Sequence, residues 1–133
     1  MHKPLQALAL SAACLLSYIS NAMAFDISKV SSAIAEFQPM GIEFVEEKIR
    51  IAVPQAQVSE QQYALMIKGI CYLQWSGELS LSPLKEVIIL NENAWSGWVL
   101  ETPGDACDTL GKKNSDEFSP SLMSFTHLAS QGW

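Results

Sequence analysis

Apolar residues recur at helical spacing in residues 25–41 and again in residues 58–77. Residues 25–41 carry one apolar stripe, with Asp26 in position to cap the start of a helix and Pro39 in position to end it. Residues 58–77 show the clearest helical pattern, and Gly77 is the residue type that commonly follows a helix end. Both segments are therefore predicted to be helices.

Alternation of apolar and charged residues predicts an extended segment between these helices. Residues 42–54 contain a half-buried strand in their second half, where the two residue types alternate. Ile42 and Phe44 are out of phase with that alternation. A bulge or tight turn near Glu46 and Glu47 is expected, because it would reconcile the two halves.

A hairpin is predicted from two further apolar runs. Residues 85–90 are mostly apolar and β-branched, which is typical of a central strand buried on both faces. Residues 97–101 are expected to be its partner strand. The polar segment 91–96 between them has the composition of a turn.

Two helices are predicted after the hairpin. A short one lies within residues 102–113, with Asp105 in its first turn, where the helix dipole favours a negative charge. The last helix is expected to begin with Ser119 as its cap and Pro120 at its first position. Its apolar stripe would continue through Ala129.

These segments predict a single α+β domain spanning residues 25–133. The expected element order is α-β-α-β-β-α-α. The expected architecture is a small sheet of about three strands with helices packed on one face.

The N-terminal residues 1–24 are predicted to be a cleaved secretory signal peptide. An apolar run follows a basic start, and the small residues Ala22 and Ala24 form a signal-peptidase site. Cleavage after Ala24 would place the mature domain in the periplasm or outside the cell. A lipoprotein anchor at Cys14 is the minor alternative, because Ser11 stands where such signals prefer leucine.

Two cysteines, Cys71 and Cys107, remain after this cleavage. An even pair in an exported chain favours one disulfide. A closed loop of about 37 residues contributes roughly 4 kcal/mol to stability through the entropy of the unfolded chain. The disulfide would therefore be a large share of the stability of so small a domain.

The net charge restricts the class of partner. Once Lys3 leaves with the signal, seven basic and fourteen acidic side chains remain, a formal net charge of −7. Such a chain repels nucleic-acid phosphates and anionic lipid surfaces, so a nucleic-acid partner is not expected. No membrane span is expected in the mature chain either. The charge favours a basic protein partner, although solubility explains the charge equally well. For an exported chain this partner would be another envelope or secreted protein. The oligomeric state stays open.

Residues 25–133 lack the sequence patterns of common catalytic and metal sites. Their one histidine, His127, falls on the flank of the last predicted helix, with Ser124 and Ser130 three residues to either side. No nucleophile motif, zinc-ligand spacing or calcium loop is present. We therefore expect no catalytic residue, no metal ion and no cofactor.

The tryptophans of the predicted hairpin provide the binding signal. Trp98 shares a strand face with Leu100, which favours core packing. Trp95 lies in the polar loop beside Asn93, so it either contacts a partner or folds back over the edge of the core. The candidate binding residues are Trp95, Trp98 and Asn93, with Trp95 foremost.

Three functions fit these patterns. The first is a small exported, non-enzymatic domain that acts through protein binding, such as an inhibitor, an immunity-type protein or an accessory factor. The second is a small-molecule or glycan-binding module that uses Trp95 and either Tyr72 or Trp75 as stacking surfaces. The third is a hydrolase-type enzyme, which would need His127 close to a serine or a carboxylate.

Overall fold

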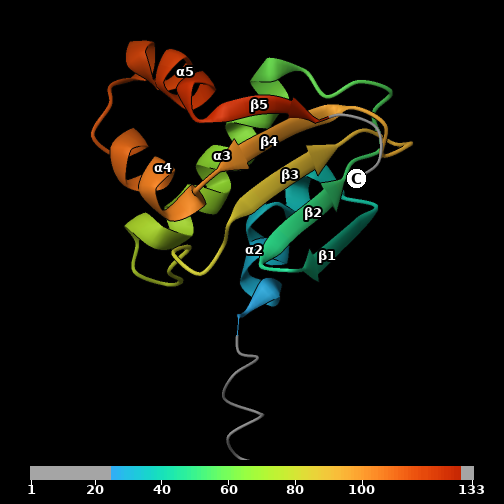
Figure 1. Cartoon of the computed structure of the whole chain (residues 1–133), viewed down its shortest axis with the longest axis horizontal. Helices are drawn as coiled ribbons and strands as arrows, with labels where there is room; N and C mark the ends of the chain where they lie inside the picture. Colours follow the sequence, from blue (N-terminus) through green and yellow to red (C-terminus); the bar gives the residue numbers. More distant parts are fainter. Residues whose placement is uncertain (1–24, 130–133) are drawn as a thin grey trace, which may run out of the picture.

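The computed structural model describes residues 25–129, so the predictions for residues 1–24 and 130–133 lie outside it. Its elements in chain order are α2 (Ile27–Ala33), the 3-10 turn η1 (Ala35–Phe37), β1 (Gly41–Val45), β2 (Lys48–Ala52), α3 (Glu60–Trp75), β3 (Glu86–Leu90), β4 (Gly97–Glu101), α4 (Pro103–Leu110), α5 (Ser115–Ser124) and β5 (Thr126–Ala129) (Figure 1).

The strands form one mixed sheet in the order β1-β2-β3-β4-β5. Neighbouring strands pair antiparallel, except that β2 and β3 run parallel and are joined by α3. Figure 1 looks onto this sheet, with α2 and α3 behind it. The predicted α+β class is confirmed, but the sheet has five strands, so the prediction of about three is wrong.

One additional strand exists because residues 42–54 fold as a hairpin rather than as a single strand. Glu46 and Glu47 form a two-residue turn with φ angles of 54° and 65°. Phe44 consequently pairs with Ile49 on the inner face of the sheet. The expected tight turn is confirmed, and it explains why the two halves of the segment are out of phase.

This hairpin turn offers a stability test. Non-glycine residues in the left-handed region cost roughly 1 kcal/mol each, whereas Asn-Gly suits such a turn. Glu46→Asn with Glu47→Gly should therefore raise the free energy of unfolding in urea by about 1–2 kcal/mol. The exposed contact of Glu47 with Lys85, at 4.0 Å, contributes little to offset this gain. Glu46→Gln with Glu47→Gln removes the same charges, and an equal gain there would assign the effect to charge instead.

The other additional strand replaces the end of the last predicted helix. α5 begins before Ser119, because Asn114 and Glu117 form a capping box, and Pro120 lies inside the helix. The helix ends at Ser124, and Thr126–Ala129 pairs with β4. The prediction of helix through Ala129 is wrong, since sheet hydrogen bonds with a distant strand outweigh the local helical spacing.

The main core lies between the helices and the inner face of the sheet. Its buried residues come from α2, α3, α4 and α5 and from β2, β3 and β4. Cys71 of α3 and Cys107 of α4 form a disulfide within it, and both are fully buried. The predicted disulfide is confirmed.

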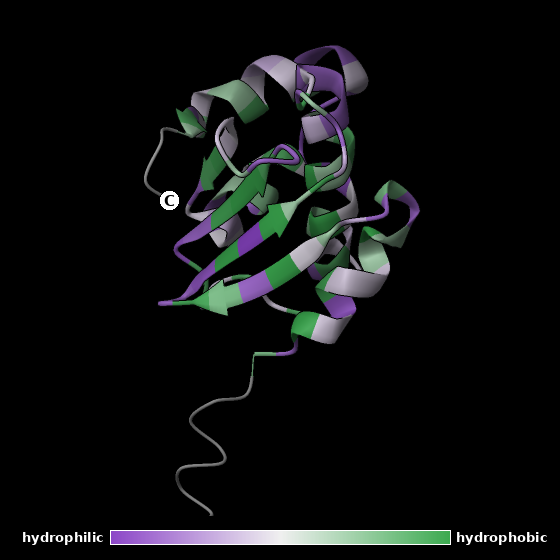
Figure 2. Ribbon diagram, turned by 90° about the vertical axis from the view of Figure 1, so that its right-hand side faces the viewer, coloured by the Kyte–Doolittle hydropathy of each residue, from purple (hydrophilic) through white to green (hydrophobic). Residues whose placement is uncertain are grey.

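The outer face of the sheet carries a smaller apolar cluster, which consists of Ile88, Leu90, Val99 and Ala129. Figure 2 shows apolar residues concentrated along the strands. Within residues 25–129, no helix combines the length and the hydropathy needed to cross a bilayer.

Candidate functional site

The loop between β3 and β4, residues 91–96, is held by the side chain of Asn91. That residue is 5% exposed. Its Nδ2 donates to the carbonyl of Ala56 at 2.8 Å, and its Oδ1 accepts from the backbone N–H groups of Trp95 (3.0 Å) and Ser96 (3.3 Å). The side chain of Asn91 therefore hydrogen-bonds both within the loop and to the segment before α3.

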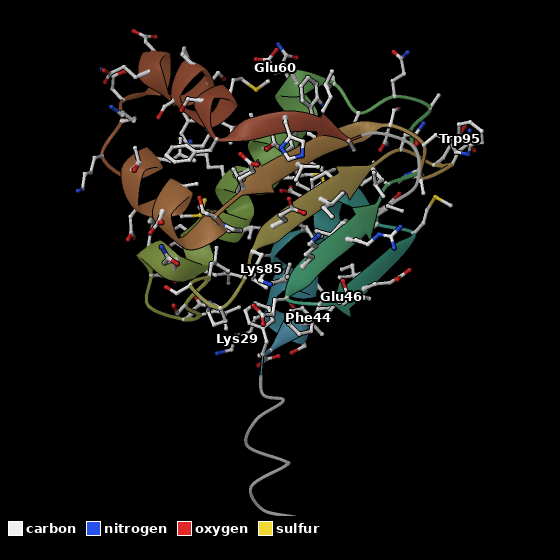
Figure 3. All side chains as sticks on the ribbon, in the orientation of Figure 1. Lys29, Phe44, Glu46, Glu60, Lys85 and Trp95 are labelled. Atoms are coloured by element: carbon white, nitrogen blue, oxygen red, sulfur yellow. A yellow bond between two sulfur atoms is a disulfide. The ribbon has the colours of Figure 1, made fainter. Side chains whose placement is uncertain are left out.

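Trp95 projects from this loop into solvent. Its exposed fraction is 59%, and Figure 3 shows its ring at the tip of the loop, pointing away from the domain. The preceding Ala94 packs against the outer-face cluster with a φ of 59°, and Asn93 is exposed. Of the two interpretations of Trp95, the structure shows the exposed one.

Trp98 belongs to the core. Its indole N–H donates to the carbonyl of Val58 at 2.9 Å, and its ring stacks on Tyr63 with the centroids 5.5 Å apart. The Tyr63 hydroxyl lies 2.7 Å from Oγ1 of Thr126, and burial raises the pKa of this hydroxyl above its usual range. Trp98 therefore supports the sheet beneath the loop, while the other two candidate binding residues are exposed.

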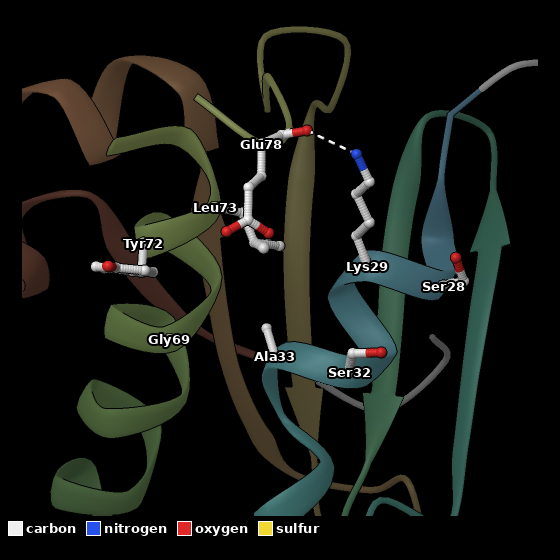
Figure 4. Close-up of a pocket in the computed structure, with 8 residues that line it drawn as sticks. All are labelled: Ser28, Lys29, Ser32, Ala33, Gly69, Tyr72, Leu73 and Glu78. Carbon is white, nitrogen blue, oxygen red and sulfur yellow. Dashed lines mark hydrogen bonds between the residues drawn. The ribbon is translucent and has the colours of Figure 1, made fainter. Parts of the chain in front are cut away.

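A groove between α2 and α3 is a second candidate surface (Figure 4). It encloses about 510 Å³, and Tyr72, which is 61% exposed, lines it. Gly69 allows α2 to approach, because a Cβ there would lie 3.3 Å from the carbonyl oxygen of Ala33. Lys29 donates to the carbonyl of Glu78 at 2.9 Å across the groove. An aromatic ring beside polar groups suits a small polar ligand.

The aromatic residues considered for ligand stacking lie on different surfaces. Trp75 packs on α4, since its indole N–H donates to the carbonyl of Cys107 at 2.7 Å. The loop that bears Trp95 contacts Ala56, before the start of α3, whereas Tyr72 lies in the last turn of that helix. These contacts place Trp95 near the start of α3, and Tyr72 and Trp75 near its end. They therefore do not bring Trp95 together with Tyr72 or Trp75 in one stacking site.

The structure places His127 on β5 rather than on a helix. Its Nδ1 lies 3.4 Å from Oε1 of Glu101. Ser124, which the helical pattern placed on the same face, instead donates its hydroxyl to the carbonyl of Ser121. Folding therefore brings a carboxylate, and not this serine, to the histidine.

No model of a known protein family, no curated protein and no solved structure matches this chain. The geometry of the surfaces of residues 25–129 therefore has to indicate the function. Sequence reasoning identified Trp95 but missed Asn91, although asparagine directly after a buried strand commonly hydrogen-bonds the backbone of the turn it opens. It also missed the contact of His127 with Glu101, which no sequence spacing indicates.

Proposed function

We propose that residues 25–133 form a small exported, non-enzymatic domain that acts by binding another protein, for example as an inhibitor, an immunity-type protein or an accessory factor. The exposed Trp95 on a loop held by Asn91 carries this proposal. Location in the periplasm or outside the cell, after cleavage following Ala24, is supported by the buried disulfide, because disulfides persist in oxidising compartments.

Trp95 has the properties of an interface anchor. An indole ring buries a large apolar area when a partner covers it. Because Asn91 already fixes the loop backbone, the loop loses little conformational entropy on binding. Truncation of such an anchor typically costs about 2 kcal/mol or more of binding free energy.

A protein with a basic surface is the expected partner. The formal net charge of residues 25–133 is −7, and the loop 91–96 contains Glu92 but no basic residue. Glu92 is exposed near Trp95. Complementary charge would increase the association rate and fix the orientation of the partner around the indole ring.

Trp95→Ala should abolish capture of a specific partner in a cross-linked pull-down from the native envelope and culture fluid, with oxidised residues 25–133 as bait. For the captured partner, the dissociation constant should rise by about 30-fold or more, which corresponds to about 2 kcal/mol. The variant should keep the urea midpoint of the wild type, because Trp95 is largely exposed.

Tyr72→Ala is the matched control, since it removes an equally exposed aromatic residue from another surface. Capture should persist in this variant. Equal capture by Trp95→Ala and the wild type, or no specific capture by either, would contradict the protein-binding proposal.

A small-molecule or glycan-binding module is the second candidate, and the groove lined by Tyr72 favours it. A thermal-shift screen against envelope glycans and metabolites tests it. Stabilisation that is lost in Tyr72→Ala and kept in Trp95→Ala would assign the function to the groove instead of the loop.

A further inference from the structure

Three side chains of the metal-ligating type meet on the outer face of the sheet, at the opposite end of the β3–β4 hairpin from Trp95. Glu86 begins β3, Glu101 ends β4, and His127 lies on β5. Glu86 stands directly opposite Glu101, while His127 pairs with Val99, two residues before Glu101. Each of three adjacent strands therefore contributes one ligand-type side chain.

The donor atoms of these side chains converge. One ligand atom from each of Glu86, Glu101 and His127 lies within 4.8 Å of the others, and Nδ1 of His127 is 3.4 Å from Oε1 of Glu101. Tetrahedral zinc, with bonds of roughly 2.0–2.2 Å, holds its ligand atoms about 3.3 Å apart. The His127–Glu101 pair already has this separation, and a small rotation of the Glu86 side chain would complete the set.

The local charges favour a cation at this position. Two carboxylates directly opposite each other on antiparallel strands repel. Oε1 of Glu86 is buried and accepts no hydrogen bond from the described residues, although Nζ of Lys48 forms an ion pair with it at 3.5 Å. Lys48 offsets one of the two negative charges. The negative charge that remains would attract a divalent cation.

Thr126, the residue before His127, holds the start of β5 in place by hydrogen bonds. Oγ1 of Thr126 donates to the carbonyl of Leu122 at 2.8 Å and lies 2.7 Å from the Tyr63 hydroxyl. Since the single Thr126 proton goes to Leu122, the Tyr63 hydroxyl is the donor in the second bond. These contacts fix the start of β5, so little reorganisation is needed to present the imidazole to an ion.

We propose that Glu86, Glu101 and His127 form a Zn²⁺ site with three protein ligands and a fourth position open to water. One imidazole nitrogen and two carboxylate oxygens are ligands that zinc accepts. Lys48 does not block the site. Its flexible side chain allows the ammonium group to move away from Glu86 as the ion enters. This inference replaces the sequence-based expectation of no metal. The ligands lie 15 and 26 positions apart, a spacing that matches no zinc motif.

Calorimetric titration of untagged, metal-free residues 25–133 with zinc chloride near neutral pH should show one zinc ion bound per chain. His127 is the one histidine of residues 25–133, so a zinc-dependent shift of its imidazole NMR signals reports this site alone. His127→Ala should lower the zinc affinity by about 100-fold, and Glu86→Gln should lower it by about 10-fold or more.

Glu60→Gln is the matched control, because it removes an exposed carboxylate at the start of α3 (Figure 3). Zinc affinity should be unchanged in this variant. Absence of zinc binding, an affinity unaffected by His127→Ala, or imidazole signals that do not respond to zinc would each overturn the proposal and leave an ion-pair network. The outcome of the zinc titration does not affect capture of a protein through Trp95, since the two surfaces are separate.

Discussion

Replacing both Cys71 and Cys107 with alanine is expected to lower the free energy of unfolding by about 4 kcal/mol. The disulfide joins α3 to α4 across a sequence separation of 36, so its loss releases a long segment of the unfolded chain. Both residues are fully buried in the main core, and the two alanines leave small voids that add to the loss. Domains of this size typically have about 5–15 kcal/mol of stability, so the variant should be marginal at elevated temperature.

Urea unfolding of the oxidised wild type and the double variant measures this difference. The slope of free energy against urea should also rise in the variant, because a chain without the cross-link unfolds to a more exposed state. Single Cys71→Ala is the control and should match the double variant, since either substitution opens the loop. A loss below about 1 kcal/mol would show that α3 and α4 are held mainly by packing rather than by the disulfide.

The parts of the fold that depend on local patterns could be predicted from the sequence. The spacing of residues 58–77 indicated α3, whose observed cap is the Ser59 hydroxyl accepting from the N–H of Gln62. The β-branched run before residues 91–96 indicated the central hairpin. The two missed strands have different causes: β1 forms a local hairpin with β2, whereas β5 exists because β4 offers it a free edge. Helical spacing in a short segment cannot reveal such an edge.

A local sequence pattern also indicated the candidate binding loop, residues 91–96. Trp95 breaks a strand alternation, and a large aromatic residue outside any buried pattern must be exposed or folded back. The choice between these outcomes depends on Asn91 and on Ala94, which anchors the loop on the outer-face cluster. The group formed by Glu86, Glu101 and His127 lay beyond sequence reasoning, because it needs both the strand order and the register of β3, β4 and β5.

The β3–β4 hairpin thus supports both proposed sites, with Trp95 before the start of β4 and Glu101 at its end. Gly97 occupies the first position of β4, between Leu90 on one side and Ala129 on the other. A Cβ added there would lie 1.9 Å from the carbonyl oxygen of Ile89, a distance that no side-chain movement can relieve. Any substitution at Gly97 must therefore displace the backbone where the loop meets the sheet.

Gly97→Ala is expected to lower the free energy of unfolding by about 3 kcal/mol or more, measured in urea, because the clash is with backbone atoms. Gly41→Ala is the matched control: Gly41 also begins a strand, and an added Cβ there meets no atom within 4 Å. Its effect should stay within about 0.5 kcal/mol. Equal stability of the two variants would contradict this prediction, because it would show that the backbone at the start of β4 accommodates a side chain at position 97. If Gly97→Ala still folds, displacement of the loop should weaken partner capture through Trp95 more than Gly41→Ala does, since Gly41 lies on the far edge strand.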